Sequence, residues 1–241
     1  MPKAIVVVSF GVGTAAKKEQ YFTPLLNEVK AAFPSFSVYE AWTSRILSER
    51  LGVSMLDDVL KEVGGEAILL LTHFSQGAEY QQKILPILRE YPKIKLTLPI
   101  LYVEQVIEHI FQSYDLEDGE HLVLVGHGSK NQHNTIYEEL QKKADKLGLP
   151  LHIGVLEESD YPNRQMVVER LQKQKVNKVL LAPLLYVGGR HASYDIVGGI
   201  WEETLRTSGV ELRTDAEGLG SKKEFRALYI KEVKRLLSSS E

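Results

Sequence analysis

The chain of 241 residues contains no cysteine. This absence excludes disulfide bonds, thiolate zinc sites, iron–sulfur ligation and thiol catalysis. Any bound metal must therefore be held by histidine and carboxylate side chains. The absence does not establish a metal site, but it defines which kind of site the chain can form.

Long apolar runs and a strong net charge are also missing. No apolar run approaches the length needed to cross a bilayer, and residues 1–10 lack the pattern of a secretory signal. We therefore expect a cytoplasmic protein with no membrane partner. The formal net charge of −3 argues against a nucleic-acid partner, which would normally require a basic domain or stripe. A hydrophobic content of 44% is ordinary for a globular protein of one large or two small domains.

The chain alternates short apolar runs with helix-patterned stretches, which predicts an α/β fold with parallel sheets. Strands are expected at 4–10, 37–44, 66–74, 95–102, 121–127, 151–157, 178–187 and 210–218. Helices are expected between them, among others at 15–32, 78–91, 163–174, 196–207 and 223–238. The sequence carries no signal for an oligomeric state.

The two halves of the chain look duplicated. Phe10 matches His127 and Glu40 matches Glu157 at one common offset, since 127 − 10 and 157 − 40 both equal 117. Glu79 matches His191 in a less regular alignment. The repeat predicts two similar α/β lobes, residues 1–117 and 118–241, that present their strand ends to a cleft between them.

Three polar residues of the second half, His127, Glu157 and His191, each lie at or just past the end of a predicted strand. Because ligands bind beyond the carboxyl ends of parallel strands, we expect these side chains to meet and to hold a divalent metal with positions left open. Each residue alone also has a plainer interpretation. His127 would be a histidine that hydrogen-bonds a turn, Glu157 a solvated acid at the end of a strand, and His191 a loop histidine. Their convergence favours the metal site. The order GHGSK does not fit a serine hydrolase elbow.

Cations follow several predicted strands: Lys17 and Lys18, Arg45, Lys130 and Arg190. Cations gathered at one rim suit a polyanionic small molecule, through charge-assisted hydrogen bonds to its carboxylates or phosphates. The competing interpretation is scattered surface charge.

Seven motifs, spread in order from Ile5 to about Leu237, resemble the anaerobic cobaltochelatases that insert metal into sirohydrochlorin, which are class II tetrapyrrole chelatases. These motifs are VVSFGVGT, AWTS, HFSQGAEY, VGHGS, GVLEESDYP, APLLYVGGRHASYD and GLG before a terminal helix. The resemblance implies two Rossmann-like, chelatase-type lobes with parallel sheets, related by a pseudo-twofold axis, and a cleft that takes the macrocycle. It also implies that the metal ligands are His127, Glu157 and His191, with Glu158 as the alternative carboxylate.

The same resemblance implies a divalent metal as substrate, Co²⁺ before Fe²⁺ or Ni²⁺, and no nucleotide or redox cofactor. At least one of the two histidines would assist loss of the pyrrole protons, and Glu79 would help to move them. We expect Phe10, Arg45, Lys130 and Arg190 to contact the tetrapyrrole. Two alternatives remain open at this stage, a ferrochelatase-like insertion into another porphyrin and a non-enzymatic metal- or tetrapyrrole-binding protein.

Overall fold

The structure is a computed structural model that describes residues 4–129, 135–189 and 191–238. The chain forms two compact units, which are described separately. Unit 1 comprises Met1–Val106 and Phe225–Glu241, and unit 2 comprises Ile107–Glu224. No helix in these described parts is long and apolar enough to cross a membrane.

Unit 1 is built on a four-stranded sheet in which every neighbouring pair is parallel, with the order β2-β1-β3-β4. The strands are β1 (Ala4–Ser9), β2 (Ser37–Trp42), β3 (Ala67–Leu71) and β4 (Lys95–Leu96). Its helices are α1 (Ala15–Tyr21), α2 (Thr23–Ala32), α3 (Arg45–Leu51), α4 (Leu56–Glu62), the π-helix η1 (Tyr80–Ile84), α5 (Leu85–Glu90), the 3₁₀ turn η2 (Ile100–Tyr102) and α10 (Lys223–Ser238), which begins two residues before the unit boundary.

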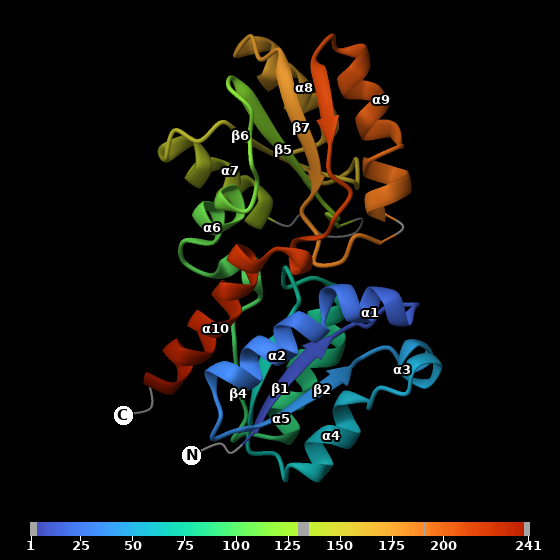
Figure 1. Ribbon diagram of the computed structural model, residues 1–241, viewed down its shortest axis with the longest axis vertical. Helices are drawn as coiled ribbons and strands as arrows, with labels where there is room; N and C mark the ends of the chain where they lie inside the picture. The colour runs from blue at the N-terminus through green and yellow to red at the C-terminus, as the bar shows by residue number, and fades with distance from the viewer. Residues whose placement is uncertain (1–3, 130–134, 190, 239–241) are drawn as a thin grey trace. The chain divides into compact units, whose positions relative to one another are not determined.

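Both faces of this sheet are covered, which is why β1 and β3 are buried at every position and, apart from Ser9, entirely apolar. One face packs alternate strand residues such as Val6 and Leu69 against Leu60 of α4 and Ile87 of α5. Figure 1 shows α1 and α2 in front of the sheet and α5 behind it. The carboxyl ends of β1, β2 and β3 are thereby left at one edge for the loops that follow them.

Unit 2 repeats the plan with a parallel sheet of order β6-β5-β7-β8. The strands are β5 (Glu120–Gly126), β6 (Leu151–Val155), β7 (Lys178–Pro183) and β8 (Glu211–Thr214). The helices are α6 (Val106–Gln112), α7 (Ile136–Lys146), α8 (Arg164–Lys173), the π-helix η3 (His191–Ile196), α9 (Ile200–Thr207) and the 3₁₀ turn η4 (Leu219–Ser221).

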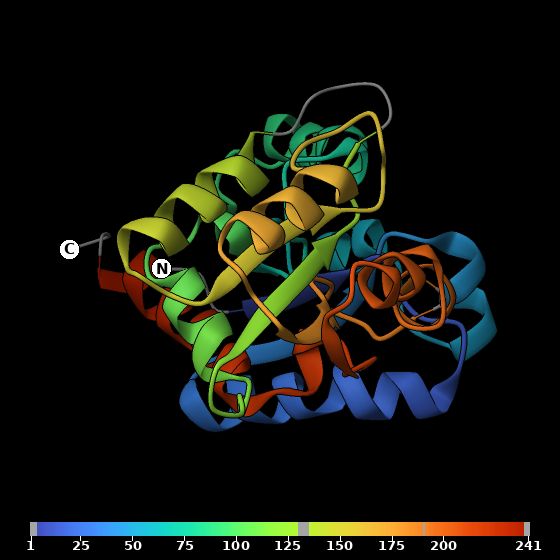
Figure 2. The same ribbon diagram turned by 90° about the horizontal axis from the view of Figure 1, so that it is seen from above.

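The core of unit 2 joins Val123 and Leu181 of the sheet to α8 and α9. Trp201 of α9 is 1% exposed and lies so close to Gly154 of β6 that a Cβ there would approach its ring within 2.2 Å. Only glycine therefore fits at this point of the edge strand. Figure 2 shows α7 and α8 running beside that edge strand.

The two parallel α/β sheets confirm the predicted fold class. The differences lie where proline or paired glycines interrupt a pattern. The helix expected at 15–32 breaks at Phe22, and Pro24 occupies the first turn of α2, where its missing N–H costs nothing. The strand expected at 95–102 shortens to β4 before Pro99, and the helix expected at 196–207 begins only after Gly199.

The division of the chain differs from the predicted boundary after residue 117. Helix α10, expected in the second lobe, packs on unit 1. Its Phe225 ring lies 5.7 Å from that of Phe74, and Arg226 makes a two-pronged ion pair with Glu28 of α2, at 2.7 Å for the closest contact. These contacts, not sequence order, decide to which unit the terminal helix belongs.

Candidate functional site

The backbone identifies equivalent positions beyond the strands of the two units. The amide of Ser44 donates to the carbonyl of Phe10 at 3.2 Å, and the amide of Glu157 donates to the carbonyl of His127 at 3.2 Å. Phe10 directly follows β1 and His127 directly follows β5. The predicted match between Phe10 and His127 is therefore confirmed.

The predicted match between Glu40 and Glu157 is wrong. Glu40 lies inside β2, paired with Val7, whereas Glu157 lies two residues beyond β6. By the hydrogen bonds above, Ser44 is the unit 1 counterpart of Glu157. The sequence offset misled because the crossover between the first two strands is four residues longer in unit 1: Ser9 pairs with Trp42 (33 apart), but Gly126 pairs with Val155 (29 apart).

Glu79 and His191 occupy equivalent positions, as expected. Thr72 donates its amide to Val8 of β1, and Leu184 donates its amide to Val125 of β5. Glu79 and His191 each lie seven residues further on, since 79 − 72 and 191 − 184 both equal 7. Glu79 is the residue before η1, and His191 is the first residue of η3. π-Helical segments are rare and frequently occur at functional sites.

The structure brings His127 and His191 together in unit 2. Their ring centroids lie 5.0 Å apart and the rings meet edge to face at 85°. His127 Nδ1 lies 3.2 Å from the carbonyl of Gly128, and His191 Nδ1 lies 2.6 Å from Asp195 Oδ2. Both imidazoles are exposed, so a small solute can reach them. This pair is the centre of the candidate site.

Glu157 is fixed beside this pair by its backbone. Besides the bond from its amide to His127, its Cβ would lie 3.2 Å from a Cβ placed at Gly128. Gly128 has φ +75°, a left-handed conformation that glycine adopts without strain. The neighbouring acid Glu158 instead pairs with Arg164 of α8 at 2.6 Å. Glu158 is thus engaged in an ion pair with α8, whereas the backbone of Glu157 is bonded to His127.

Asp160 connects the loops that carry His127 and Glu157. It is fully buried, and its carboxylate accepts hydrogen bonds from the amides of Ser129 and Tyr161, both at 2.8 Å. Its own amide donates to the carbonyl of Glu157 at 2.9 Å. A buried carboxylate that binds backbone amides of two loops holds those loops in register. The sequence does not single out Asp160, because its burial depends on how the two loops pack.

A complete metal-binding group is not gathered in the described parts of the chain. Among those residues, no set of three or more histidine, aspartate or glutamate side chains lies in an arrangement that could hold a metal ion. The structure thus juxtaposes the two imidazoles, while the three-ligand set of His127, Glu157 and His191 stays a prediction. Lys130 and Arg190, expected to contact substrate, lie outside the described residues.

In unit 1, Glu79 is held by a neighbouring hydroxyl. Thr43, which is 7% exposed and follows β2, donates a short hydrogen bond from Oγ1 to the Glu79 carboxylate. Phe10 presents an apolar ring that is 53% exposed, and Arg45 is an exposed cation at the start of α3. The residues expected to move protons and to contact substrate in this unit therefore all follow strands of one sheet. Thr43 was not predicted from the sequence.

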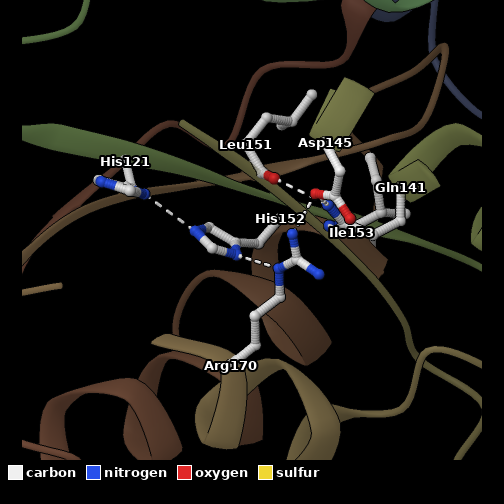
Figure 3. Close-up of polar contacts among 7 residues, drawn as sticks. All are labelled: His121, Gln141, Asp145, Leu151, His152, Ile153 and Arg170. Atoms are coloured by element: carbon white, nitrogen blue, oxygen red, sulfur yellow. Dashed lines mark hydrogen bonds and ion pairs between the residues drawn. The ribbon is translucent and has the colours of Figure 1, made fainter. Parts of the chain in front are cut away.

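Two other histidines of unit 2 are committed to a separate network (Figure 3). Arg170 Nε donates to His152 Nδ1 at 3.1 Å, so His152 carries its proton on Nε2 and donates to His121 Nδ1 at 3.0 Å. His152 is 1% exposed, and burial, with help from the positive charge of Arg170, lowers its pKa to about 3. Since both nitrogens of His152 are engaged, this network is structural.

The fold has a counterpart among solved structures. A multi-domain protein from Deinococcus radiodurans, described as structurally similar to chelatases, has a TM-score of 0.61 to this chain and 13% sequence identity. The match covers 95% of this chain and 54% of that protein, so the chain spans about half its length. This likeness shows the fold alone.

The chain belongs to the cobalt chelatase (CbiK) family, which it matches over residues 3–238. It is 25% identical to a sirohydrochlorin cobaltochelatase of Salmonella typhimurium, over 99% of this chain and 97% of that protein. It is also 25% identical to sirohydrochlorin cobaltochelatase CbiKC of Nitratidesulfovibrio vulgaris, over 98% of this chain and 91% of that protein. The resemblance inferred from the motifs is confirmed.

Proposed function

We propose that this protein inserts a divalent cobalt ion into sirohydrochlorin, a step of cobalamin biosynthesis. Membership of the cobalt chelatase family over nearly the whole chain supports this function, as do two relatives of matching length named for the same reaction. The observation that carries the proposal at the level of residues is the pair His127 and His191, whose rings meet beyond the strand ends of unit 2.

The metal substrate binds to His127, His191 and Glu157. Imidazole nitrogen suits Co²⁺, Ni²⁺ and Fe²⁺, and one carboxylate adds a hard, negatively charged ligand that partly neutralises the ion. Three protein ligands leave further positions open, as a site that must pass its ion to another ligand set requires. The backbone hydrogen bond from Glu157 to His127 keeps this residue beside the two imidazoles. Its side chain completes the ligand set by turning toward them.

Insertion of a divalent ion displaces the two pyrrole protons of the macrocycle, so bases must accept both protons. At least one of the two histidines accepts a proton as the metal leaves it, and Glu79 of unit 1 relays protons onward. The hydroxyl of Thr43 holds one oxygen of the Glu79 carboxylate and leaves the other to act as the base.

Sirohydrochlorin is rich in carboxylates, so the protein needs cations to bind it. Arg45, Lys130 and Arg190 supply them in this proposal, through charge-assisted hydrogen bonds. The exposed ring of Phe10 offers an apolar surface to the flat face of the macrocycle. The Arg45 side chain is solvent-accessible and therefore free to reorient toward a ligand.

The test is an insertion assay with purified protein, followed by absorbance spectroscopy, in a matrix of Co²⁺, Fe²⁺ and Ni²⁺ against sirohydrochlorin and protoporphyrin. We expect the fastest catalysed metallation with Co²⁺ and sirohydrochlorin, far above the protein-free rate. His127→Ala should abolish most of it, while His109→Ala, which removes a histidine of α6, should not. Saturable binding without turnover would instead identify a binding protein, and faster reaction with protoporphyrin would identify a ferrochelatase-like enzyme.

A further inference from the structure

Both imidazoles of the candidate site use Nδ1 to donate a hydrogen bond. A carbonyl oxygen can only accept, so the 3.2 Å contact with Gly128 places the proton of His127 on Nδ1. An ionised carboxylate can also only accept, so the 2.6 Å contact with Asp195 places a proton on Nδ1 of His191. In their neutral forms both rings therefore keep the lone pair on Nε2.

Asp195 reaches His191 because of the local helix. The two residues are four apart within η3, a spacing that brings side chains to the same side of a helical turn. The contact lies at the surface, with 54% of the His191 side chain and 47% of the Asp195 side chain exposed. Its loss removes no core packing, so any effect of Asp195 on the metal can be separated from an effect on folding.

We infer that Asp195 is a positioning residue for the metal substrate: its carboxylate holds His191 in the Nδ1–H form and directs Nε2 to the incoming divalent ion. A carboxylate behind a metal-binding histidine fixes the tautomer and orientation of the ring and makes the binding nitrogen more basic. This inference rests on the proposed function, because it takes His191 as a ligand of the metal to be inserted.

The competing interpretation is an ordinary surface pair. An exposed ion pair within one helical turn contributes little to stability, and its removal leaves the properties of a neighbouring site unchanged. The chain offers a matched control in Asp58 of α4, which faces Lys61 one turn away at 3.9 Å, with both side chains 69% exposed. Asp58→Ala deletes a pair of this kind in unit 1.

The experiment measures the dissociation constant of Co²⁺ for the tetrapyrrole-free protein by competition with a chromophoric chelator. Asp195→Ala should weaken Co²⁺ binding about 10–100-fold, the usual effect of removing such a partner, with an unchanged melting temperature. Asp195→Asn keeps an acceptor oxygen and should lose less. Asp58→Ala should bind Co²⁺ as the wild type does.

A spectroscopic measurement reports the tautomer directly. In ¹⁵N-histidine-labelled protein without metal, long-range ¹H–¹⁵N correlations should show His191 protonated on Nδ1, with the resonance identified by its loss in His191→Gln. Asp195→Ala should shift the proton toward Nε2, and Asp195→Asn should restore the wild-type pattern. An Asp195→Ala variant with unchanged Co²⁺ affinity and an Nδ1–H ring would reduce the pair to surface charge.

The outcomes separate this inference from the proposed function. Wild-type protein that metallates sirohydrochlorin while Asp195→Ala keeps full Co²⁺ affinity overturns the inference alone. Wild-type protein that fails to metallate sirohydrochlorin, although Asp195→Ala weakens Co²⁺ binding, overturns the proposed reaction and supports the role of Asp195 in holding the metal.

Discussion

At the scale of single residues, Glu79 and His191 illustrate how one backbone position serves two purposes. Both stand seven residues beyond equivalent points of their sheets and at the start of a π-helix, yet one is a carboxylate and the other an imidazole. A carboxylate anchored by Thr43 is suited to proton transfer. An imidazole beside a second imidazole is suited to a transition metal. The duplicated fold thus presents different chemistry at matched positions.

Glu79→Gln should slow insertion and leave metal binding intact. The amide cannot act as a base, so we expect kcat to fall by about 10²–10⁴-fold, while Co²⁺ affinity stays at the wild-type value because the proposed ligands are in unit 2. Thr43→Val, which removes only the hydroxyl donor, should give a smaller loss of kcat. Steady-state kinetics and metal titration of the same samples check both. A loss of Co²⁺ affinity equal to the loss of kcat would place Glu79 among the metal ligands instead.

The sequence was sufficient to nominate His127, Glu157 and His191, because polar residues in the segments that follow buried parallel strands are readily recognised from the pattern of hydrophobicity. It was not sufficient to nominate Asp160, Asp195 or Thr43. Asp160 and Thr43 act through contacts with other loops, which depend on three-dimensional packing, and Asp195 reaches His191 only because residues 191–196 form a helical turn. Asp160 is the clearest case, since the acidic run EESD gives no sign that one of its members is fully buried.

At the scale of secondary-structure elements, the sequence predicted which strands and helices exist more reliably than their ends. Continuous apolar runs identified β1, β3, β5 and β7, because both faces of each sheet are covered. The two π-helices could not be predicted, since a π-turn differs from an α-turn only in hydrogen-bond spacing. The π-helix η1 ends at Ile84, two residues before Pro86, which lies in the first turn of α5.

Two buried histidines, His152 in β6 and His73 in unit 1, make the stability of the protein depend on pH. Burial lowers the pKa of His152 to about 3, and burial likewise lowers the pKa of His73 in unit 1 to about 4. The unfolded chain binds these protons near pH 6.5, so between the two pKa values the unfolded state carries more protons than the folded state. The stabilisation is therefore complete above about pH 6.5 and is lost as the pH falls toward 3.

Chemical unfolding at pH 7 and pH 5 tests this account. The free energy of unfolding should fall on acidification, with a slope of up to about 1.4 kcal/mol per pH unit for each buried histidine. His152→Asn keeps an acceptor for Arg170 but cannot be protonated in this range, so its slope should be shallower than that of the wild type. Equal slopes for the two proteins would contradict the assignment of His152 as a buried, neutral histidine.

At the scale of the whole molecule, the repeat was visible in the sequence but its alignment was only partly right. Phe10 with His127 and Glu79 with His191 proved equivalent, while Glu40 with Glu157 did not. A constant offset assumes that both halves have crossovers of equal length, and the first crossover differs by four residues. The final helix was assigned to the wrong unit for a related reason, because a sequential division cannot show that a chain returns to its first unit.

The return of α10 to unit 1 can be tested by destabilising its anchor. Phe225 is fully buried and its ring contacts those of Phe74 and Tyr229, so Phe225→Ala should cost unit 1 about 3–5 kcal/mol. Native-state hydrogen exchange should then speed up for the amides of β1 and β3 and remain unchanged for those of β5 and β7. Ile46→Ala, at a side chain that is 71% exposed, serves as the control without effect. Faster exchange in β5 and β7 with β1 and β3 unaffected would instead restore α10 to the second lobe, because a cavity weakens the unit whose core it opens.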